Sequence, residues 1–414
     1  MVKRKPAKSK FTKFAQATKK FKGKKLGNLR DQKKKPRVDP LWTLDDGVTY
    51  SLLSSFLNCR ERFHIANVQG WKPKKFNFPL EFGNIIHLLI EAQDMGIPND
   101  LITNITTNYV KEKINSNNFN EETIKELSMM AAVAAVTFKH YVAFWEQNAC
   151  FFIDDRWYYE KDFHWLAKEE NFDVDYTMPN GRKIKLRGKR DGRFKIGRRI
   201  KGYWIYETKT KGNIDPAGIT AGLHKDMQTG MYSVASQIEQ NGIAPEGVLY
   251  NVIRRTGMKP RVGDSPQSFA ERVEEDMLKK PEHYFMRWTR KISKDELNDF
   301  KRRQLNPTLH QIVTWWDSIK NNPMRPFETT CDGCYRTKST EKCRLCKGTG
   351  VIDNLNHFER AFGHYDAMSF SQRGEFFEII TDNNYFLYEQ KQHTFPELDS
   401  EEKISDYLPE PNHI

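Results

Sequence analysis

Apolar residues recur at helical spacing in the first third of the chain and at every second position in the part that follows. The helical spacing predicts a short helix from Thr49, a second helix over residues 81–95 and a long helix capped by Asn120. Period-two alternation then predicts strands over residues 151–163, 172–178, 183–194 and 203–210. Because these strands follow one another closely, we expect an antiparallel meander.

Both patterns alternate in the second half of the chain. They predict a helix over 219–240, a buried strand over 247–253, a helix over 267–280, a strand over 284–289 and a helix over 294–320 that is kinked at Pro307. Helices and strands that interleave in this way indicate a mixed α/β (α+β) fold, with a central sheet flanked by helices.

The positive charge of the chain is concentrated at its start. Residues 1–38 hold sixteen Lys and Arg and one acid, a net charge of +15, while the whole chain carries +13 and the other 376 residues therefore −2. With so little apolar material, residues 1–38 are predicted to form a disordered basic tail. Such a tail can hold DNA, RNA or an anionic membrane surface, and it can equally serve as a solubilising arm.

No uninterrupted apolar run approaches the roughly 18 to 20 residues that a bilayer span needs. The longest candidate covers residues 129–138, and the basic start lacks the apolar segment of a secretory signal. We therefore expect a cytoplasmic protein without a membrane partner. Six cysteines, four of them within residues 331–346, indicate a metal site in a reducing compartment and not a disulfide framework.

Two acids and a lysine lie on neighbouring predicted strands. Glu207 follows sixteen residues after Asp191, and Lys209 follows two residues later. Residues i and i+2 of a strand face the same side, so Glu207 and Lys209 point into one cleft while Thr208 points into the core. Hydrolysis of a phosphodiester needs a hard cation such as Mg²⁺ or Mn²⁺ on oxygen ligands, and a nearby lysine can orient the attacking water. Solvated strand faces and turns use the same residue types, so the pattern alone leaves both interpretations open.

Further short motifs occur in a fixed order around these three residues. They are Ser51 to Cys59 with Phe63, Gly83 with His87, Glu160, Gly188 with Asp191, Glu207 with Lys209, and Gln228 with Tyr232. In this order they resemble the PD-(D/E)XK nuclease superfamily, in its RecB-type exonuclease branch, over residues 50–235. The resemblance implies a restriction-endonuclease-like central sheet in a nuclease domain over residues 39–325.

The resemblance also implies roles for individual residues. The implied ligands of a catalytic Mg²⁺ or Mn²⁺ are His87, Asp191, Glu207 and the backbone carbonyl of Thr208. Lys209 would serve the attacking water. His87 lies on an apolar helix, where a lone histidine is often a core residue. Glu160 is either an orienting group or a solvated strand residue, and Asp162 competes with it for the alignment.

Gln228 and Tyr232 complete the set of catalytic residues that the resemblance implies. They lie four residues apart and therefore share one helix face. They either contact a phosphate or brace the site, and a buried tyrosine with a glutamine partner is the purely structural alternative. The family often has Cys-Pro at its first helix, where this chain has Cys59 and Arg60, and this departure weakens any role of Cys59.

Four cysteines form a separate motif that predicts a metal-binding module over residues 326–352. Cys331 and Cys334 form one C-x₂-C pair, and Cys343 and Cys346 form a second. Four thiolates at this spacing predict tetrahedral Zn²⁺. The alternative is a [4Fe–4S] cluster that includes Cys59, as in some RecB-type nucleases, although the spacing differs from that pattern. Cys150 is expected to be a buried thiol, and residues 353–414 form a C-terminal extension.

The sequence supports two hypotheses of function. The first is a metal-dependent DNA nuclease, an exonuclease by its resemblance, that acts in recombination, repair or end processing. No Gly-x₄-Gly-Lys-(Ser/Thr) motif occurs, so a helicase or recombination partner would be another chain. The compact size and lysine-rich arm resemble phage auxiliary enzymes, which would act in the host cytoplasm. The second hypothesis is a catalytically silent nucleic-acid-binding or scaffold protein that keeps the nuclease fold.

Overall fold

The computed structural model describes residues 40–73, 77–94, 96–98, 101–116, 119–153, 155–196, 202–223, 225–319, 328–330, 351–353 and 377–379. These residues belong to the unit Pro40–Ile414. The predicted basic tail, the four cysteines of the predicted module and nearly all of the C-terminal extension lie outside them. The corresponding predictions therefore stay predictions.

A mixed five-stranded sheet with the order β4-β5-β6-β7-β8 forms the centre of the fold. Its strands are β4 (Phe163–Thr177), β5 (Lys183–Ile196), β6 (Trp204–Lys211), β7 (Gly247–Arg254) and β8 (Phe285–Lys291). Neighbouring strands are antiparallel except for β6 and β7, which are parallel. A parallel pair needs a crossover connection, and helices α7 (Pro216–Leu223) and α8 (Met227–Glu239) supply it. The predicted mixed fold with a central sheet flanked by helices is confirmed.

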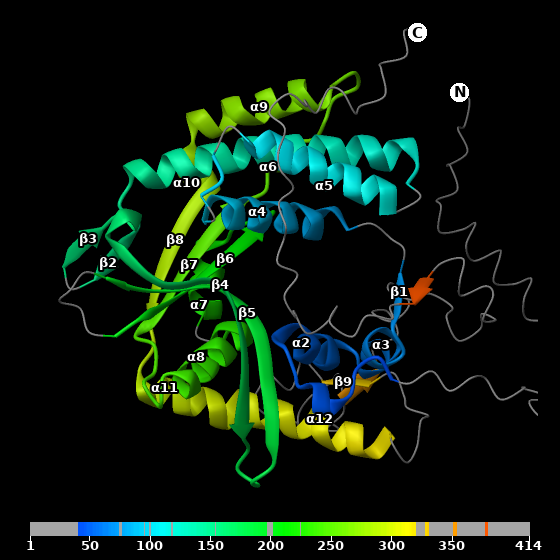
Figure 1. The fold of residues 1–414 in the computed structure, drawn as a ribbon, viewed down its shortest axis with the longest axis vertical. Helices are drawn as coiled ribbons and strands as arrows, with labels where there is room; N and C mark the ends of the chain where they lie inside the picture. The colour runs from blue at the N-terminus through cyan, green and yellow to red at the C-terminus, as the bar shows by residue number, and fades with distance from the viewer. Residues whose placement is uncertain are drawn as a thin grey trace, which may run out of the picture. The chain divides into compact units, whose positions relative to one another are not determined.

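Helices lie on both faces of the sheet (Figure 1). On one face, α4 (Phe78–Asp94), α6 (Glu121–Gln147) and α9 (Pro266–Lys279) share an apolar core with the strands, and α5 (Ile102–Ser116) packs on α6. On the other face, α2 (Tyr50–Asn58), α8 and α12 (Asn306–Ile319) form a second core. Short elements complete the described chain: η2 (Leu44–Asp46), α3 (Arg60–Phe63), η3 (His64–Val68), η5 (Glu160–Asp162), α10 (Pro281–Tyr284), α11 (Lys294–Phe300) and η6 (Lys301–Leu305).

Three two-stranded sheets lie outside the central one. They pair β1 (Trp71–Pro73) with β11 (Phe377–Ile379), β9 (Glu328–Thr330) with β10 (Val351–Asp353), and β2 (Phe151–Ile153) with β3 (Arg156–Tyr158). The single strand predicted over 151–163 is therefore wrong. A tight hairpin and a turn of 3₁₀ helix occupy this segment, and the first central strand begins only at Phe163.

Capping residues fix the helix starts that the sequence predicted. Thr49 accepts the amide proton of Leu52 at the start of α2, and Asn120 accepts that of Thr123 at the start of α6. The helix predicted over 219–240 is instead two helices, because Asp226 caps a new helix start at α8. The helix predicted over 294–320 is interrupted by the π-helical segment η6 between α11 and α12, and this segment ends two residues before Pro307, which lies in the first turn of α12.

Helix α6 is, within the described residues, the one helix long and apolar enough to cross a membrane by length and composition alone. Its most apolar window is 67% buried inside the protein, where it packs against α4, α5 and α9. A core helix passes the same test, and the burial of residues such as Phe138 and Trp145 accounts for its hydropathy.

Candidate active site

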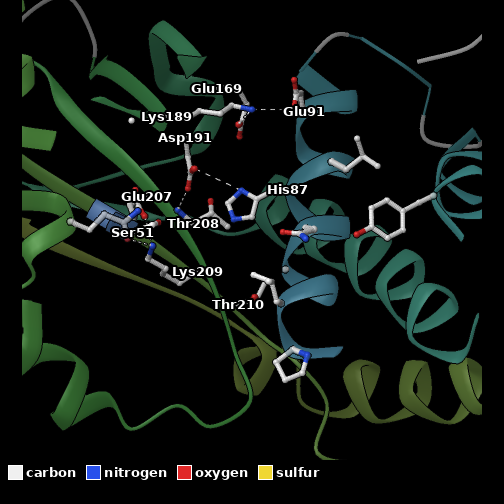
Figure 2. Close-up of a pocket in the computed structure, with 18 of the residues that line it drawn as sticks. Ser51, His87, Glu91, Glu169, Lys189, Asp191, Glu207, Thr208, Lys209 and Thr210 are labelled. Atoms are coloured by element: carbon white, nitrogen blue, oxygen red, sulfur yellow. Dashed lines mark hydrogen bonds and ion pairs between the residues drawn. The ribbon is translucent and has the colours of Figure 1, made fainter. Parts of the chain in front are cut away.

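A cavity of about 940 Å³ lies where β5 and β6 diverge. The ladder between these strands ends at the pair Gly192 and Tyr206, and the next opposed residues, Asp191 and Glu207, both line the cavity. Helices α2, α4, α5 and α8 supply the remaining walls. Figure 2 shows α4 presenting His87 towards Asp191 across this space. The strand pair thus opens at the point where the sequence placed its two acids.

Asp191 contacts both strand β6 and helix α4. Its Oδ2 accepts a hydrogen bond from the Thr208 amide at 2.5 Å, and its Oδ1 lies 3.7 Å from His87 Nδ1. The N–H and C=O of one strand residue point to the same neighbouring strand. The carbonyl of Thr208 is therefore directed into the gap beside Asp191, while its side chain is buried on the core side.

Glu207 and Lys209 lie side by side on one face of β6, as the period-two pattern predicted. Lys209 Nζ lies 2.5 Å from Glu207 Oε1. The Glu207 side chain is only 1% exposed, and its second oxygen, Oε2, has no hydrogen-bond partner among the described residues. A buried carboxylate oxygen without a partner is costly unless a cation or donor meets it. Glu207 thus offers one buried carboxyl oxygen, Oε2, as a possible ligand to the cavity.

Gln228 and Tyr232 brace the lysine. Gln228 Oε1 accepts a hydrogen bond from Lys209 Nζ at 2.6 Å, and Gln228 Nε2 donates to the Tyr232 hydroxyl at 2.9 Å. The first helical turn of α8 fixes Gln228, because Asp226 accepts its backbone amide proton at 2.7 Å. Of the two roles that the sequence left open, these contacts favour bracing. Both residues also line the cavity.

The acid at the site from the first central strand is Glu169 and not Glu160. Glu160 lies outside the cavity lining, where its carboxylate contacts Arg287 at 2.7 Å. Glu169 faces Asp191 because the flanking cross-strand pairs, Lys168 with Gly192 and Glu170 with Arg190, set the register. Glu169 has a φ of +49°, a conformation that few residues other than glycine adopt.

His87, Glu169 and Asp191 form a candidate metal site. Their ligand atoms all lie within 4.8 Å of one another. Glu169 Oε1 is a second buried oxygen without a described partner, and its Oε2 contacts Lys189 at 2.7 Å. Carboxylates with an imidazole are a fitting donor set for Mg²⁺ or Mn²⁺. The residues present therefore fit a divalent cation.

Burial sets the protonation of this cluster in the metal-free protein. Desolvation raises the pKa of Asp191 to about 6, that of Glu169 to about 7 and that of Glu207 to about 8. Asp191 adds to the shift at Glu169 and at Glu207 by charge repulsion. Desolvation also lowers the pKa of His87, which keeps its imidazole neutral and able to bind a metal. Burial acts to lower the pKa of Lys209, but Glu207 and Asp191 outweigh it and raise that pKa.

These shifts predict how pH acts on the metal-free protein. A raised carboxyl pKa means that the folded state keeps a proton that the unfolded chain has already released. The cluster therefore contributes most to stability below about pH 4, where the unfolded carboxyls are also protonated, and this contribution is lost as pH rises towards 8. A divalent cation binds the deprotonated form and offsets the loss.

We accordingly expect the rise in melting temperature on adding 10 mM Mg²⁺ to be small near pH 5.5 and several degrees near pH 8.5. Thermal denaturation with and without the ion measures this difference. A Mg²⁺ effect that is equal at both pH values would contradict the prediction. Sodium sulphate at the same ionic strength serves as the control for screening.

Cys59 and Cys150 are free, buried thiols. Cys59 caps α3, its sulfur accepting the Arg62 amide proton at 3.4 Å, and burial raises the pKa of its thiol. Strand β9 ends one residue before Cys331 and packs against α2 and α3. Cys150 is buried, as predicted, and its burial raises the pKa of the thiol as well.

The comparison with known families agrees with the arrangement of the sheet and its acids. The family model of the PD-(D/E)XK nuclease superfamily matches residues 48–346. The chain belongs to this superfamily, whose members are generally metal-dependent phosphodiesterases. No curated protein matches the sequence.

Proposed function

We propose that this protein is a DNA nuclease that hydrolyses phosphodiester bonds with Mg²⁺ or Mn²⁺. The observation that carries the proposal is the convergence of Asp191, Glu207 and Lys209 on one cavity, in which buried carboxylate oxygens have no hydrogen-bond partner among the described residues. His87, Glu169, Asp191, Glu207 and the Thr208 carbonyl would hold the ion. A metal-free binding protein gains nothing from buried anions where phosphates must approach.

The chain's own residues define the chemistry at the site. When bound, the ion neutralises the phosphate and lowers the pKa of a coordinated water. Lys209 is a charged donor, because the neighbouring acids keep it protonated, and it cannot accept the proton of the water. It therefore orients the nucleophile and stabilises negative charge that develops on the phosphate. Gln228 holds the ammonium in place through the 2.6 Å hydrogen bond.

We further propose the RecB-type branch and exonuclease action. The support is the order of the motifs along the chain. Ser51, His87, Asp191, Glu207, Gln228 and Tyr232 from these motifs line one cavity, whereas Cys59 and Glu160 do not. Recombination, repair or end processing is the setting in which such an activity would serve. The basic tail and a helicase or recombination protein on another chain would supply DNA.

A nuclease assay on linear and circular duplex DNA tests the proposal. With Mg²⁺ or Mn²⁺, wild-type protein should degrade linear DNA and leave covalently closed circles intact, and EDTA should stop the reaction. Cleavage of circles would replace the exonuclease assignment with endonuclease action. No hydrolysis of any DNA or RNA with either ion would favour the silent binding protein.

We propose that cations beside β6, the catalytic strand that carries Glu207 and Lys209, mark a path for the substrate backbone. Lys211, Arg255 and Lys259 form no ion pair with any described residue, whereas Lys189 and Lys209 do. The segments that carry them adjoin, since the Arg255 amide donates to the Lys211 carbonyl at 2.8 Å. Positive side chains on adjoining segments repel one another and attract a polyanion.

We expect the double substitution Lys211→Ala and Arg255→Ala to weaken DNA binding and to lower the slope of log affinity against log salt by about two. Fluorescence anisotropy over a salt series measures the slope. The exposed Lys279 and Lys294, on α9 and α11, offer a matched double-alanine control that should keep the wild-type slope. An unchanged slope in the Lys211 and Arg255 variant would remove this path.

For the four cysteines outside the described residues we propose bound Zn²⁺, with a [4Fe–4S] cluster that includes Cys59 as the alternative. The support for zinc is the spacing of Cys331, Cys334, Cys343 and Cys346. Metal analysis with visible absorption separates the two, because only the cluster is coloured.

A further inference from the structure

A row of buried polar side chains crosses the sheet behind the catalytic strand. Thr208, Asn251 and Arg287 are cross-strand neighbours on β6, β7 and β8. Asn251 Nδ2 donates to Thr208 Oγ1 at 3.1 Å, and Arg287 Nε donates to Asn251 Oδ1 at 3.0 Å. Thr208 and Asn251 are at most 1% exposed. The row ends at the peptide that contacts Asp191.

The position of Arg287 is fixed from several sides. Its Nη2 donates to Glu160 at 2.7 Å, to the Tyr141 hydroxyl at 2.9 Å and to the Tyr206 hydroxyl at 3.0 Å. The guanidinium also lies 4.2 Å from the centre of the Trp145 ring, a cation–π distance. The side chain of Arg287 is 1% exposed. A buried ion pair of this kind is weak evidence for stability, since apolar residues of similar size often serve as well.

The catalytic strand needs support from the side of this row. Beyond the pair Gly192 and Tyr206, β6 has no ladder with β5, so residues 207–211 are held in the sheet by β7 alone. The backbone ladder with β7 fixes their register. At Thr208, the hydrogen bond from the Asn251 side chain reinforces this backbone ladder. The Thr208 amide donates to Asp191 on the opposite edge of the strand.

We infer that Asn251, held by Arg287, is a positioning residue for the metal site: its hydrogen bond to Thr208 Oγ1 sets the peptide that contacts Asp191 and whose carbonyl would face a bound cation. The inference rests on the proposed function. It also explains Glu160, which serves as the counter-ion of Arg287 and is not a metal ligand. Groups that orient metal ligands without touching the ion commonly change its affinity by 10- to 100-fold.

Thr208→Val tests the inference, because valine keeps the size and the backbone and lacks only the acceptor oxygen. Calorimetric titration of the full chain with Mn²⁺ should give an affinity about tenfold weaker than that of wild type. Asn251→Leu should weaken it similarly, and the double variant should be no weaker than either single one, since both remove one hydrogen bond. Thr208→Ser keeps the hydroxyl and should stay within about twofold of wild type.

Tyr176→Phe is the matched control for a general effect on the core. It removes the hydroxyl of a buried tyrosine that donates to Asn306 Oδ1 at 2.7 Å, does not line the cavity, and leaves Thr208, Asn251 and Arg287 untouched. It should lower the melting temperature and leave the Mn²⁺ affinity unchanged. Equal Mn²⁺ affinity of Thr208→Val and wild type would overturn the inference and leave the row a structural feature of the core.

The same titration separates this failure from that of the proposed function. Binding at the site is the Mn²⁺ binding that Glu207→Gln abolishes. If wild type and Glu207→Gln bind Mn²⁺ alike, the proposed metal site itself is wrong and the positioning role falls with it. If only Thr208→Val behaves like wild type, the metal site stands and the positioning role is refuted.

Discussion

Glu207→Gln is expected to lower the rate of DNA hydrolysis by about a thousandfold or more, the scale typical of losing a group that binds the catalytic ion. Glutamine has the same size, but it offers no negative charge to the cation. The expected loss is in kcat, measured with linear DNA at saturating Mg²⁺. Glu170→Gln is the matched control, since Glu170 lies next to Glu169 on β4 but contacts Arg190 and Arg193 instead of the cavity.

The same substitution should make the metal-free protein more stable. Burial raises the pKa of Glu207 to about 8, so its charged form is disfavoured in the fold at higher pH, and a neutral amide avoids this cost. We expect a higher melting temperature than wild type at pH 8.5 and little difference near pH 5. Glu170→Gln should be less stable than wild type and keep its activity. A Glu207→Gln protein that is both active and less stable would contradict the account.

Lys209→Met is expected to decrease kcat by about a hundredfold to a thousandfold. Methionine fills the space of the lysine stem, but it cannot orient water or stabilise charge on the phosphate. The substitution also removes the close cationic partner of Glu207. Because the proposed role concerns the reacting atoms, KM for DNA should change little.

Lys183→Met provides the control for Lys209→Met. Lys183 is an exposed cation at the start of β5 and does not line the cavity. Its substitution should leave kcat within about twofold of wild type. If Lys209→Met raised KM and left kcat unchanged, the lysine would bind DNA and take no part in hydrolysis.

The sequence predicted the catalytic strand well because a period of two is a local property. Glu207 and Lys209 share a face whatever the rest of the fold does, and the burial of Thr208 follows from the same alternation. The caps at Thr49 and Asn120 are local as well, and both helix starts were correct. Interactions within a few residues were therefore enough for these features.

The first central strand was harder to predict because its middle carries no alternation. Residues 167–171 are all half-buried, and the strand contains a register shift between Trp165 and Ala167. Glu169 reaches Asp191 through a positive φ and a cross-strand register, and neither is visible in local periodicity. Glu169 can be identified as a site residue only when the register between β4 and β5 is known. Lys189, two residues before Asp191, could have been placed on the same face from the sequence.

Long-range contacts decided the remaining features. Helix α5 was not predicted, since its polar sequence over Ile102–Ser116 has little apolar periodicity and it folds against α6. The bracing role of Gln228 depends on where α8 lies relative to β6. Glu160 looked like a site residue by sequence order, but its partner Arg287 lies 127 residues away.

If the carboxylates of Asp191 and Glu207 together hold one divalent cation, anomalous diffraction from crystals soaked in Mn²⁺ will locate it between them. We expect one strong anomalous peak in the cavity, within bonding distance of both carboxylates and of His87, which disappears in Glu207→Gln crystals. A peak that persists unchanged in that variant, or well-ordered carboxylates with no Mn²⁺ between them, would refute shared coordination by these two acids.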